Sequence, residues 1–240
     1  MTLSNTVPYS KRKAEDPIRI LHLDASTPEC SVAISEDGKL IHSSLSKADP
    51  IADFSRLVRD CLEKSELKLK DIGAISVNSG PGSYTALRSG ISFAKGLCVS
   101  LNLPLLAIPT LECWAWAGLA QISDLSLSFE NFGVILHTRR NQFVGATFNQ
   151  NTETLGSLIE GDLEHFEFWS NLPALIFSQH DELVFKNITH QHLIYINPQA
   201  FHQVRPAFKL FQLGHYSDLH QFNPLYLYDP YITIPKQKLS

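Results

Sequence analysis

The chain has 240 residues, of which 44% are hydrophobic and 18% are charged, and its formal net charge is −4. This length and composition are typical of a soluble globular protein built as one large domain or two small ones. The acidic balance argues against a stand-alone RNA-binding protein, because such proteins more often carry a basic field.

The cysteines and the apolar stretches indicate the cellular compartment that we expect for the chain. The four cysteines are far apart and form no CxxC, so we expect no disulfide framework and a reducing, cytoplasmic location. The longest apolar stretch, residues 96–108, is interrupted by Pro104 and is too short to cross a bilayer. Residues 1–16 are polar and predict a flexible tail rather than a secretory signal.

The first half of the chain predicts alternating strands and helices. Apolar residues at i, i+3, i+4, i+7 and i+8 predict an amphipathic helix over residues 53–65. A Gly-Pro-Gly-Ser turn at residues 80–83 leads into a second helix that ends near Ser100, and a third helix begins at Leu111. Aliphatic runs bounded by turns predict strands at residues 18–23, 30–34, 39–45, 72–77 and 103–108.

The second half repeats the mixture of strands and helices more weakly. Strands are predicted at residues 134–137, 142–148, 174–177 and 193–196, and a helix at residues 198–213. This order predicts an α/β layered fold. We expect a flexible tail over residues 1–16, a first lobe over 17–112, and a smaller second lobe over 113–240 with an extended end.

Five short motifs are more specific than these patterns. They are DASTPECSVA at residues 24–33, GPGSYTALRSGI at 80–91, AKGL at 94–97, PTLE at 109–112 and NPLYL at 223–227. In this order they resemble the motifs of the TsaB (YeaZ) family. The resemblance is strong over residues 18–114 and holds only in outline beyond them.

The family resemblance implies an actin-like, two-lobed fold of the ribonuclease-H type, the ASKHA class. It also implies a part in forming threonylcarbamoyladenosine in tRNA. In that family TsaB is similar in fold to the catalytic subunit TsaD but is not itself the catalyst. It binds TsaD and, with the ATPase TsaE, forms the working assembly, so contact with tRNA is expected to be indirect.

This sequence departs from the family pattern at three places. The position that follows Phe-Thr in the family is usually Gly and is Ala86 here, and the Phe itself is Tyr84. The family's Asp-Ala-Arg at the start of the second-lobe hairpin is His137-Thr138-Arg139. An acidic residue is therefore missing where catalytic relatives contact phosphate or metal, which argues against nucleotide chemistry in this chain.

The glycine turn has two readings. Backbone N–H groups at a helix N-terminus can bind an anion, but the turn has neither the Walker pattern nor GxGxxG. The favoured reading is structural, with Ser83 as the N-cap of the helix and glycines that admit positive φ. At most weak nucleotide binding and no cofactor are expected. The candidate nucleotide or phosphate contacts are Asp24, Ser26, Thr27, Gly82, Ser83 and Arg88.

The helix after the turn carries two stripes. One is apolar and predicts a core face, whereas the other combines small residues with an aromatic one and favours close approach of a partner helix. The alternative is a helix sandwiched within one subunit. We expect this second stripe to bind a TsaD-like subunit, or a second copy of this chain when it is alone. Its members are Tyr84, Ala86, Ser89, Gly90, Phe93 and Ser100.

No catalytic or metal-binding set emerges from the remaining residues. His190 and His192 lie on one face of a strand, but nothing nearby in the sequence completes a metal site. The HxxxH helix that the catalytic relative uses for its metal is absent from the sequence. The prediction is a non-catalytic scaffold with no membrane contact. The alternatives are an ATPase or sugar-kinase-like enzyme, a metallopeptidase-like enzyme, and a self-associating structural protein.

Overall fold

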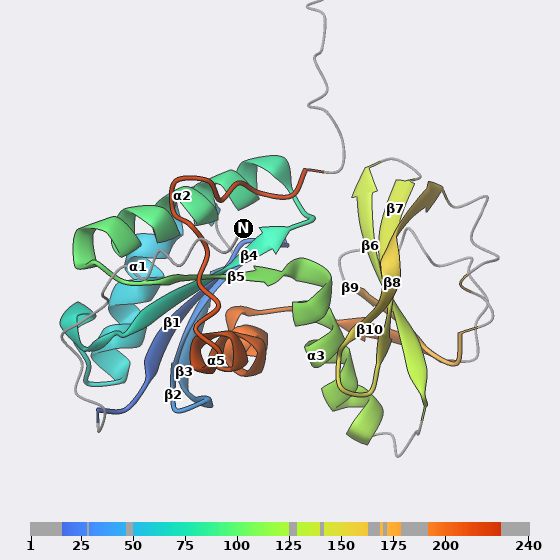
Figure 1. Ribbon diagram of the computed structural model, residues 1–240, viewed down its shortest axis with the longest axis horizontal. Coiled ribbons are helices and arrows are strands. Elements are labelled where there is room, and N and C mark those ends of the chain that lie inside the picture. The colour runs from blue at the N-terminus through green and yellow to red at the C-terminus, as the bar shows by residue number, and fades with distance from the viewer. Residues whose placement is uncertain are drawn as a thin grey trace, which may run out of the picture.

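The computed structural model describes residues 16–27, 29–46, 50–124, 129–139, 142–162, 169, 172–178 and 192–226. Two five-stranded sheets form the two lobes of the molecule (Figure 1). The expected tail, Asp16 apart, and the end of the chain beyond Tyr226 lie outside the described residues.

The first sheet combines an antiparallel hairpin with two parallel strands. β1 pairs antiparallel with β2 and parallel with β4. β2 pairs antiparallel with β3, and β4 pairs parallel with β5. The strand order is β3 (Lys39–Ser46), β2 (Cys30–Glu36), β1 (Arg19–Asp24), β4 (Ala74–Gly80) and β5 (Leu105–Pro109).

The second sheet has the same topology. β6 pairs antiparallel with β7 and parallel with β9. β8 pairs antiparallel with β7, and β10 pairs parallel with β9. The strand order is β10 (Leu193–Ile196), β9 (Leu175–Ser178), β6 (Asn131–Arg139), β7 (Gln142–Asn149) and β8 (Thr154–Asp162). Two lobes that share one ribonuclease-H-type strand order make the α/β, actin-like fold that the resemblance implied.

Helices cover both faces of the first sheet. The helices α1 (Pro50–Lys64) and α2 (Tyr84–Leu101) pack on one face, whereas α5 (Val204–Gln212) packs against β1, β3 and β5 on the other. The helix α3 (Thr110–Asp124) lies between the two sheets (Figure 1). Short 3-10 helices, η1 (Leu69–Asp71) and η4 (Ala200–Gln203), complete the described elements. The expected boundary at residues 112 and 113 places α5 in the second lobe, whereas its contacts are with the first sheet.

The apolar stripes of α1 and α2 explain which face of each helix packs against the first sheet. The predicted stripe of α1 is buried, with Phe54, Leu57 and Cys61 at most 2% exposed. In α2 the buried residues include Leu87 and Ile91, which belong to the predicted core face. The helix ends at Asn102, whose left-handed backbone (φ 53°) stops the helical hydrogen-bond ladder.

One strand was not predicted. The strand β8 reads TLGSLIEGD, and its apolar residues do not alternate with polar ones. It lies at the edge of the second sheet, where Leu155 and Leu158 are 45% and 38% exposed. Because an edge strand has one neighbour and no buried face here, sequence periodicity carried no signal for it.

A buried polar network ties the returning chain to the first sheet. The His22 ring hydrogen-bonds Ser76 Oγ at 2.7 Å and Ser35 Oγ at 2.8 Å. Gln203 of η4 accepts from Ser76 Oγ at 2.7 Å and donates to Asn78 Oδ1 at 2.9 Å. Burial lowers the pKa of His22 to about 3, so its ring is neutral and bridges two hydroxyls.

The four cysteines are free and buried, where they pack as small hydrophobic side chains. Burial raises the pKa of the Cys98 thiol to about 12, which disfavours the reactive thiolate. Within the described part of the chain, no helix is both long and apolar enough to span a bilayer.

Candidate functional site

The exposed face of α2 is the first candidate site. Val99 on this face is 69% exposed, the highest value among the large hydrophobic side chains of the described residues. A Cβ placed on Gly96 would meet no atom within 4 Å. The neighbouring exposed positions of this face are Thr85, Arg88, Ser92 and Ser100. A partner helix can therefore approach the backbone of α2 closely at Gly96.

Two residues of the predicted partner stripe face inward instead. Gly90 is buried, and a Cβ on it would lie 3.1 Å from Ala25 Cβ and 3.7 Å from the Phe54 ring. Ala86 is 6% exposed. The close approach that these small residues permit is made within the chain, at the contact of α2 with α1 and the β1–β2 turn. For Ala86 and Gly90 the expectation of an exposed partner face is therefore corrected.

The other members of that stripe lie nearer the surface. Phe93 is half-buried and stacks on Phe54. Tyr84 is 39% exposed. The hydroxyls of Ser89 and Ser100 donate to carbonyls of their own helix, at Thr85 and Leu97. Contact of these four residues with a partner stays a prediction.

The β1–β2 turn carries three of the predicted nucleotide contacts, and all three are buried. Asp24, Ser26 and Thr27 are 1%, 6% and 4% exposed. Asp24 Oδ1 accepts hydrogen bonds from the amide and the hydroxyl of Ser26, both at 2.7 Å. The Trp114 indole donates to Ser26 Oγ at 3.4 Å, so α3 closes over the turn. Desolvation raises the pKa of Asp24, which favours its neutral form.

The glycine turn lies beside the β1–β2 turn. A Cβ on Gly82 would lie 3.5 Å from the Ser26 carbonyl oxygen, so these two predicted contacts are neighbours. Ser83 occupies the N-cap position of α2, but its side chain makes no capping hydrogen bond, which corrects the expected capping role. Arg88 is directed at Tyr84, whose hydroxyl accepts its hydrogen bond at 2.8 Å. The Leu225 amide donates a hydrogen bond to the carbonyl of Ser79, the residue directly before the turn.

The histidine pair proposed from the sequence is only half described. His190 lies outside the described residues, and the His192 ring lies 5.4 Å from that of Phe129. Across the described ranges no three His, Cys, Asp or Glu side chains gather as metal ligands. The residues His137-Thr138-Arg139 end β6, where the Thr138 hydroxyl donates to the Gln142 carbonyl across the hairpin at 3.1 Å.

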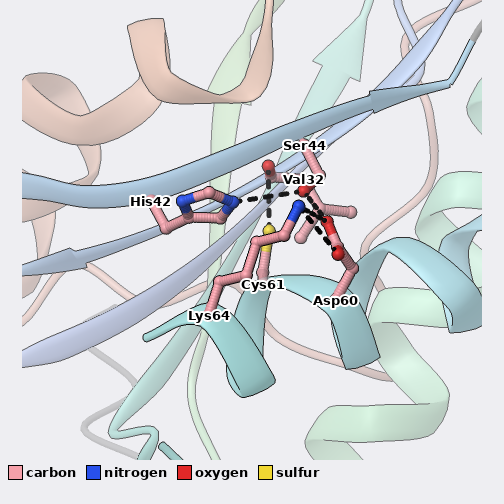
Figure 2. A network of polar contacts seen from close by, with 6 residues as sticks. All are labelled: Val32, His42, Ser44, Asp60, Cys61 and Lys64. Carbon is pink, nitrogen blue, oxygen red and sulfur yellow. Dashed lines mark hydrogen bonds and ion pairs between the residues drawn. The ribbon is translucent and has the colours of Figure 1, made fainter. Parts of the chain in front are cut away.

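One polar cluster was not predicted. Figure 2 shows the Ser44 side chain between those of His42, also on β3, and Asp60 on α1. The Ser44 hydroxyl donates to Asp60, and His42 Nε2 lies 3.5 Å from Ser44 Oγ. Lys64 bonds the same carboxylate at 3.0 Å, and these hydrogen bonds lower the pKa of Asp60. The imidazole does not stand between the serine and the acid, so the order of a hydrolase triad is not met.

This cluster instead fastens α1 to β3. The Cys61 thiol donates to the Val32 carbonyl at 3.4 Å and adds a contact from α1 to β2. The spacing of Asp60 and Lys64, four residues apart on a helix, was the available sequence signal. Their contact with Ser44 depends on the packing of α1 against β3, which the sequence pattern does not reveal.

Comparisons with known proteins agree with this architecture. Residues 51–209, about two thirds of the chain, match the family described as TsaD: tRNA N6-adenosine threonylcarbamoyltransferase. The chain is 38% identical over 99 residues to the tRNA threonylcarbamoyladenosine biosynthesis protein TsaB of Escherichia coli strain K12. That match covers 41% of this chain and 43% of the E. coli protein, so it spans less than half of that relative.

Two further matches extend over more of the chain. TsaB of Buchnera aphidicola subsp. Acyrthosiphon pisum is 25% identical over 179 residues, covering 70% of this chain and 78% of that protein. The structure of YeaZ from Pseudomonas aeruginosa superposes with a TM-score of 0.73 at 22% identity, over 88% of this chain and 100% of that one. At this identity the superposition supports the fold alone.

The chain belongs to the family described as TsaD: tRNA N6-adenosine threonylcarbamoyltransferase. Within it, the chain is similar in sequence to proteins named TsaB and similar in fold to YeaZ.

Proposed function

We propose that this chain is a non-catalytic subunit that binds a TsaD-like catalytic subunit in the formation of threonylcarbamoyladenosine in tRNA. Its TsaB relatives are named for biosynthesis of this modified nucleoside. In the proposed assembly a TsaE-like ATPase joins the two subunits, tRNA contacts the catalytic partner, and the compartment is the cytoplasm.

The closed β1–β2 turn supports a role without catalysis. An acidic residue that handles metal and phosphate has to reach solvent or ligand, whereas Asp24 is 1% exposed and held by Ser26. The sequence also lacks HxxxH, which the resemblance assigns to the catalytic relative. Binding and positioning of a partner then remain as the contribution of this chain.

The main support for the proposed interface is the open space beside Gly96. Glycine in a helix interior costs about 1 kcal/mol relative to alanine. Nothing in the described chain lies within 4 Å of the missing Cβ, so no contact inside this subunit requires glycine there. Val99, 69% exposed and one turn away on the same face, supplies apolar surface that a partner helix would cover. Without the partner, the same face is expected to pair two copies of this chain.

The experiment is a calorimetric titration of the TsaD-like protein from the same organism with variants of this face. Gly96→Arg raises helix propensity but adds bulk, and Val99→Asp places a charge in the contact. Each is expected to weaken binding at least about tenfold, which corresponds to about 1.4 kcal/mol.

Two variants serve as controls. Gly96→Ala raises helix propensity with one methyl group and should bind within a few-fold of the wild type. Leu158→Asp changes an exposed apolar residue of the second lobe and should leave binding unchanged. Unaltered affinity of folded Gly96→Arg and Val99→Asp would place the interface elsewhere. Absence of any complex with the wild type would contradict the proposed function.

A further inference from the structure

The segment Ser217–Tyr226 forms a strap along the edge of the first lobe. It leaves α5, runs past the edge of β5 and crosses to the beginning of α2 (Figure 1). The Ser217 amide donates to the Leu105 carbonyl at 2.8 Å, which covers the free edge of β5. Further along, Leu219 and Phe222 pack on the apolar core beneath α2.

Two polar contacts attach the strap to α2 and the glycine turn. Lys95 donates to the Phe222 carbonyl at 2.5 Å, and its ammonium group lies 5.7 Å from the centre of the Phe222 ring. The Leu225 amide donates to the Ser79 carbonyl at 2.7 Å. The cation of Lys95 is thereby directed at the chain itself.

The glycine turn is shaped for this backbone. Gly80 has φ +105°, a conformation that residues with a side chain rarely adopt. A Cβ at this position would lie 2.7 Å from the Leu225 carbonyl oxygen, closer than two such atoms can approach. Because the obstacle is a backbone atom, any residue other than glycine would force the strap away from the turn.

The end of the strap reaches the first turn of α2. The rings of Tyr226 and Tyr84 lie 4.6 Å apart, and the Arg88 guanidinium lies 5.1 Å from the centre of the Tyr84 ring. The strap thus contacts α2 at its first residue, Tyr84, and again at Lys95, just beyond the middle of the helix.

We propose that the strap is a latch for α2, that Ser79 and the glycine turn hold the end of the strap, and that release of the strap increases local opening of the N-terminal half of the helix. The effect of the latch on partner binding rests on the function proposed above. The coupling between the strap and the helix stands independently of it.

Amide hydrogen exchange of the intact chain tests the latch. The variant Gly80→Ala should raise exchange about tenfold or more in two regions, residues 219–226 and residues 84–91, because local protection follows local opening. Gly156→Ala is the matched control, since Gly156 also has positive φ (+89°) but has no atom within 4 Å of a Cβ. It carries the same kind of backbone strain without the collision, and both regions should exchange as in the wild type.

A second variant keeps the test valid if Gly80→Ala does not fold. Lys95→Met keeps the apolar stem but removes the hydrogen bond to Phe222, and it should raise exchange in the same two regions to a smaller degree. The latch is overturned if both variants leave residues 219–226 protected, or if the strap opens while residues 84–91 keep wild-type exchange.

Titration with the TsaD-like protein separates the two proposals. Gly80→Ala should bind about tenfold more weakly than Gly156→Ala, equivalent to about 1.4 kcal/mol. Equal affinities would contradict the claim that the strap affects partner binding at the exposed face of α2. If the wild type does not bind at all, the proposed function fails, whereas exchange of residues 84–91 still decides whether strap and helix are coupled.

Discussion

Phe93 of α2 stacks on Phe54 of α1, with ring centroids 5.6 Å apart and an interplanar angle of 18°. The two helices that cover the first sheet are therefore joined by an aromatic pair at the margin of the core. Such pairs add about 0.5–1.5 kcal/mol beyond the burial of their area. This contact assigns Phe93 a structural role within the chain before any role at an interface.

The first prediction is that substitutions at Phe93 and Val99 differ in their effect on the free energy of unfolding. Phe93→Ala should lower the free energy of unfolding by about 2 kcal/mol, because a half-buried aromatic contact is lost. Val99→Asp should change it by no more than about 0.5 kcal/mol, since the side chain is largely exposed. Urea denaturation followed by circular dichroism measures both. An equally large loss in Val99→Asp would show that this face of α2 is covered by the chain itself.

The second prediction concerns two glycines in helices. A Cβ on Gly118 of α3 would lie 2.0 Å from Ile176 Cδ1 and 2.7 Å from its Cγ1, so Gly118→Ala should destabilise the protein by about 2 kcal/mol through overpacking. The matched change Gly96→Ala meets no atom and should stabilise it by about 1 kcal/mol through helix propensity. Melting temperatures that shift in the same direction would contradict this difference.

The third prediction is a pH dependence caused by His22. Its pKa is about 3 in the folded protein against 6.5 normally, so below pH 6.5 the unfolded chain binds a proton that the folded chain does not. Stability is therefore lost as the pH falls from 6.5 towards 3, by at most about 1.4 kcal/mol per pH unit from this group.

The variant His22→Gln isolates this contribution. It should be less stable than the wild type at pH 7, and the difference should shrink by about 2 kcal/mol between pH 6.5 and 4.5. His202, whose pKa burial lowers to about 4, titrates in both proteins and cancels in the comparison. A difference that stays constant over this range would mean that the His22 ring is protonated in the folded state.

The fourth prediction is that ATP with Mg²⁺ does not bind at the β1–β2 turn. A phosphate group would have to displace packed side chains, Trp114 among them, to reach Asp24. Titration calorimetry should show no saturable heat up to about 1 mM ATP, which corresponds to binding weaker than about −4.1 kcal/mol. Micromolar binding that disappears in Asp24→Asn would instead support the ATPase alternative.

The sequence predicted the architecture well where apolar periodicity was strong. The stripe of α1, the hairpin at the start of the chain and the strands of the first sheet appear close to their expected positions. The edge strand β8 escaped because no buried face imposed a pattern on it. The pattern of α2 was ambiguous for another reason. A helix with two apolar or small faces does not itself indicate which one its own chain covers, and Gly90 proved to lie against Ala25 and Phe54.

The candidate site depends on contacts between residues far apart in the chain. The glycine turn was recognisable as a turn, but its contact with Leu225 joins residues about 145 positions apart and follows from no local propensity. The burial of Asp24 likewise depends on Trp114 of α3, which a motif at residues 24–33 cannot reveal.

Reconstitution of tRNA modification tests the central claim most directly. Threonylcarbamoyladenosine would be measured by mass spectrometry of digested tRNA, after incubation with an activated threonylcarbamoyl donor and the TsaD-like and TsaE-like proteins. We predict that this chain alone forms none, that its addition to the other two proteins raises the yield strongly, and that Gly96→Arg abolishes this increase. Modification by this chain alone, or a yield that does not respond to its addition, would contradict the account.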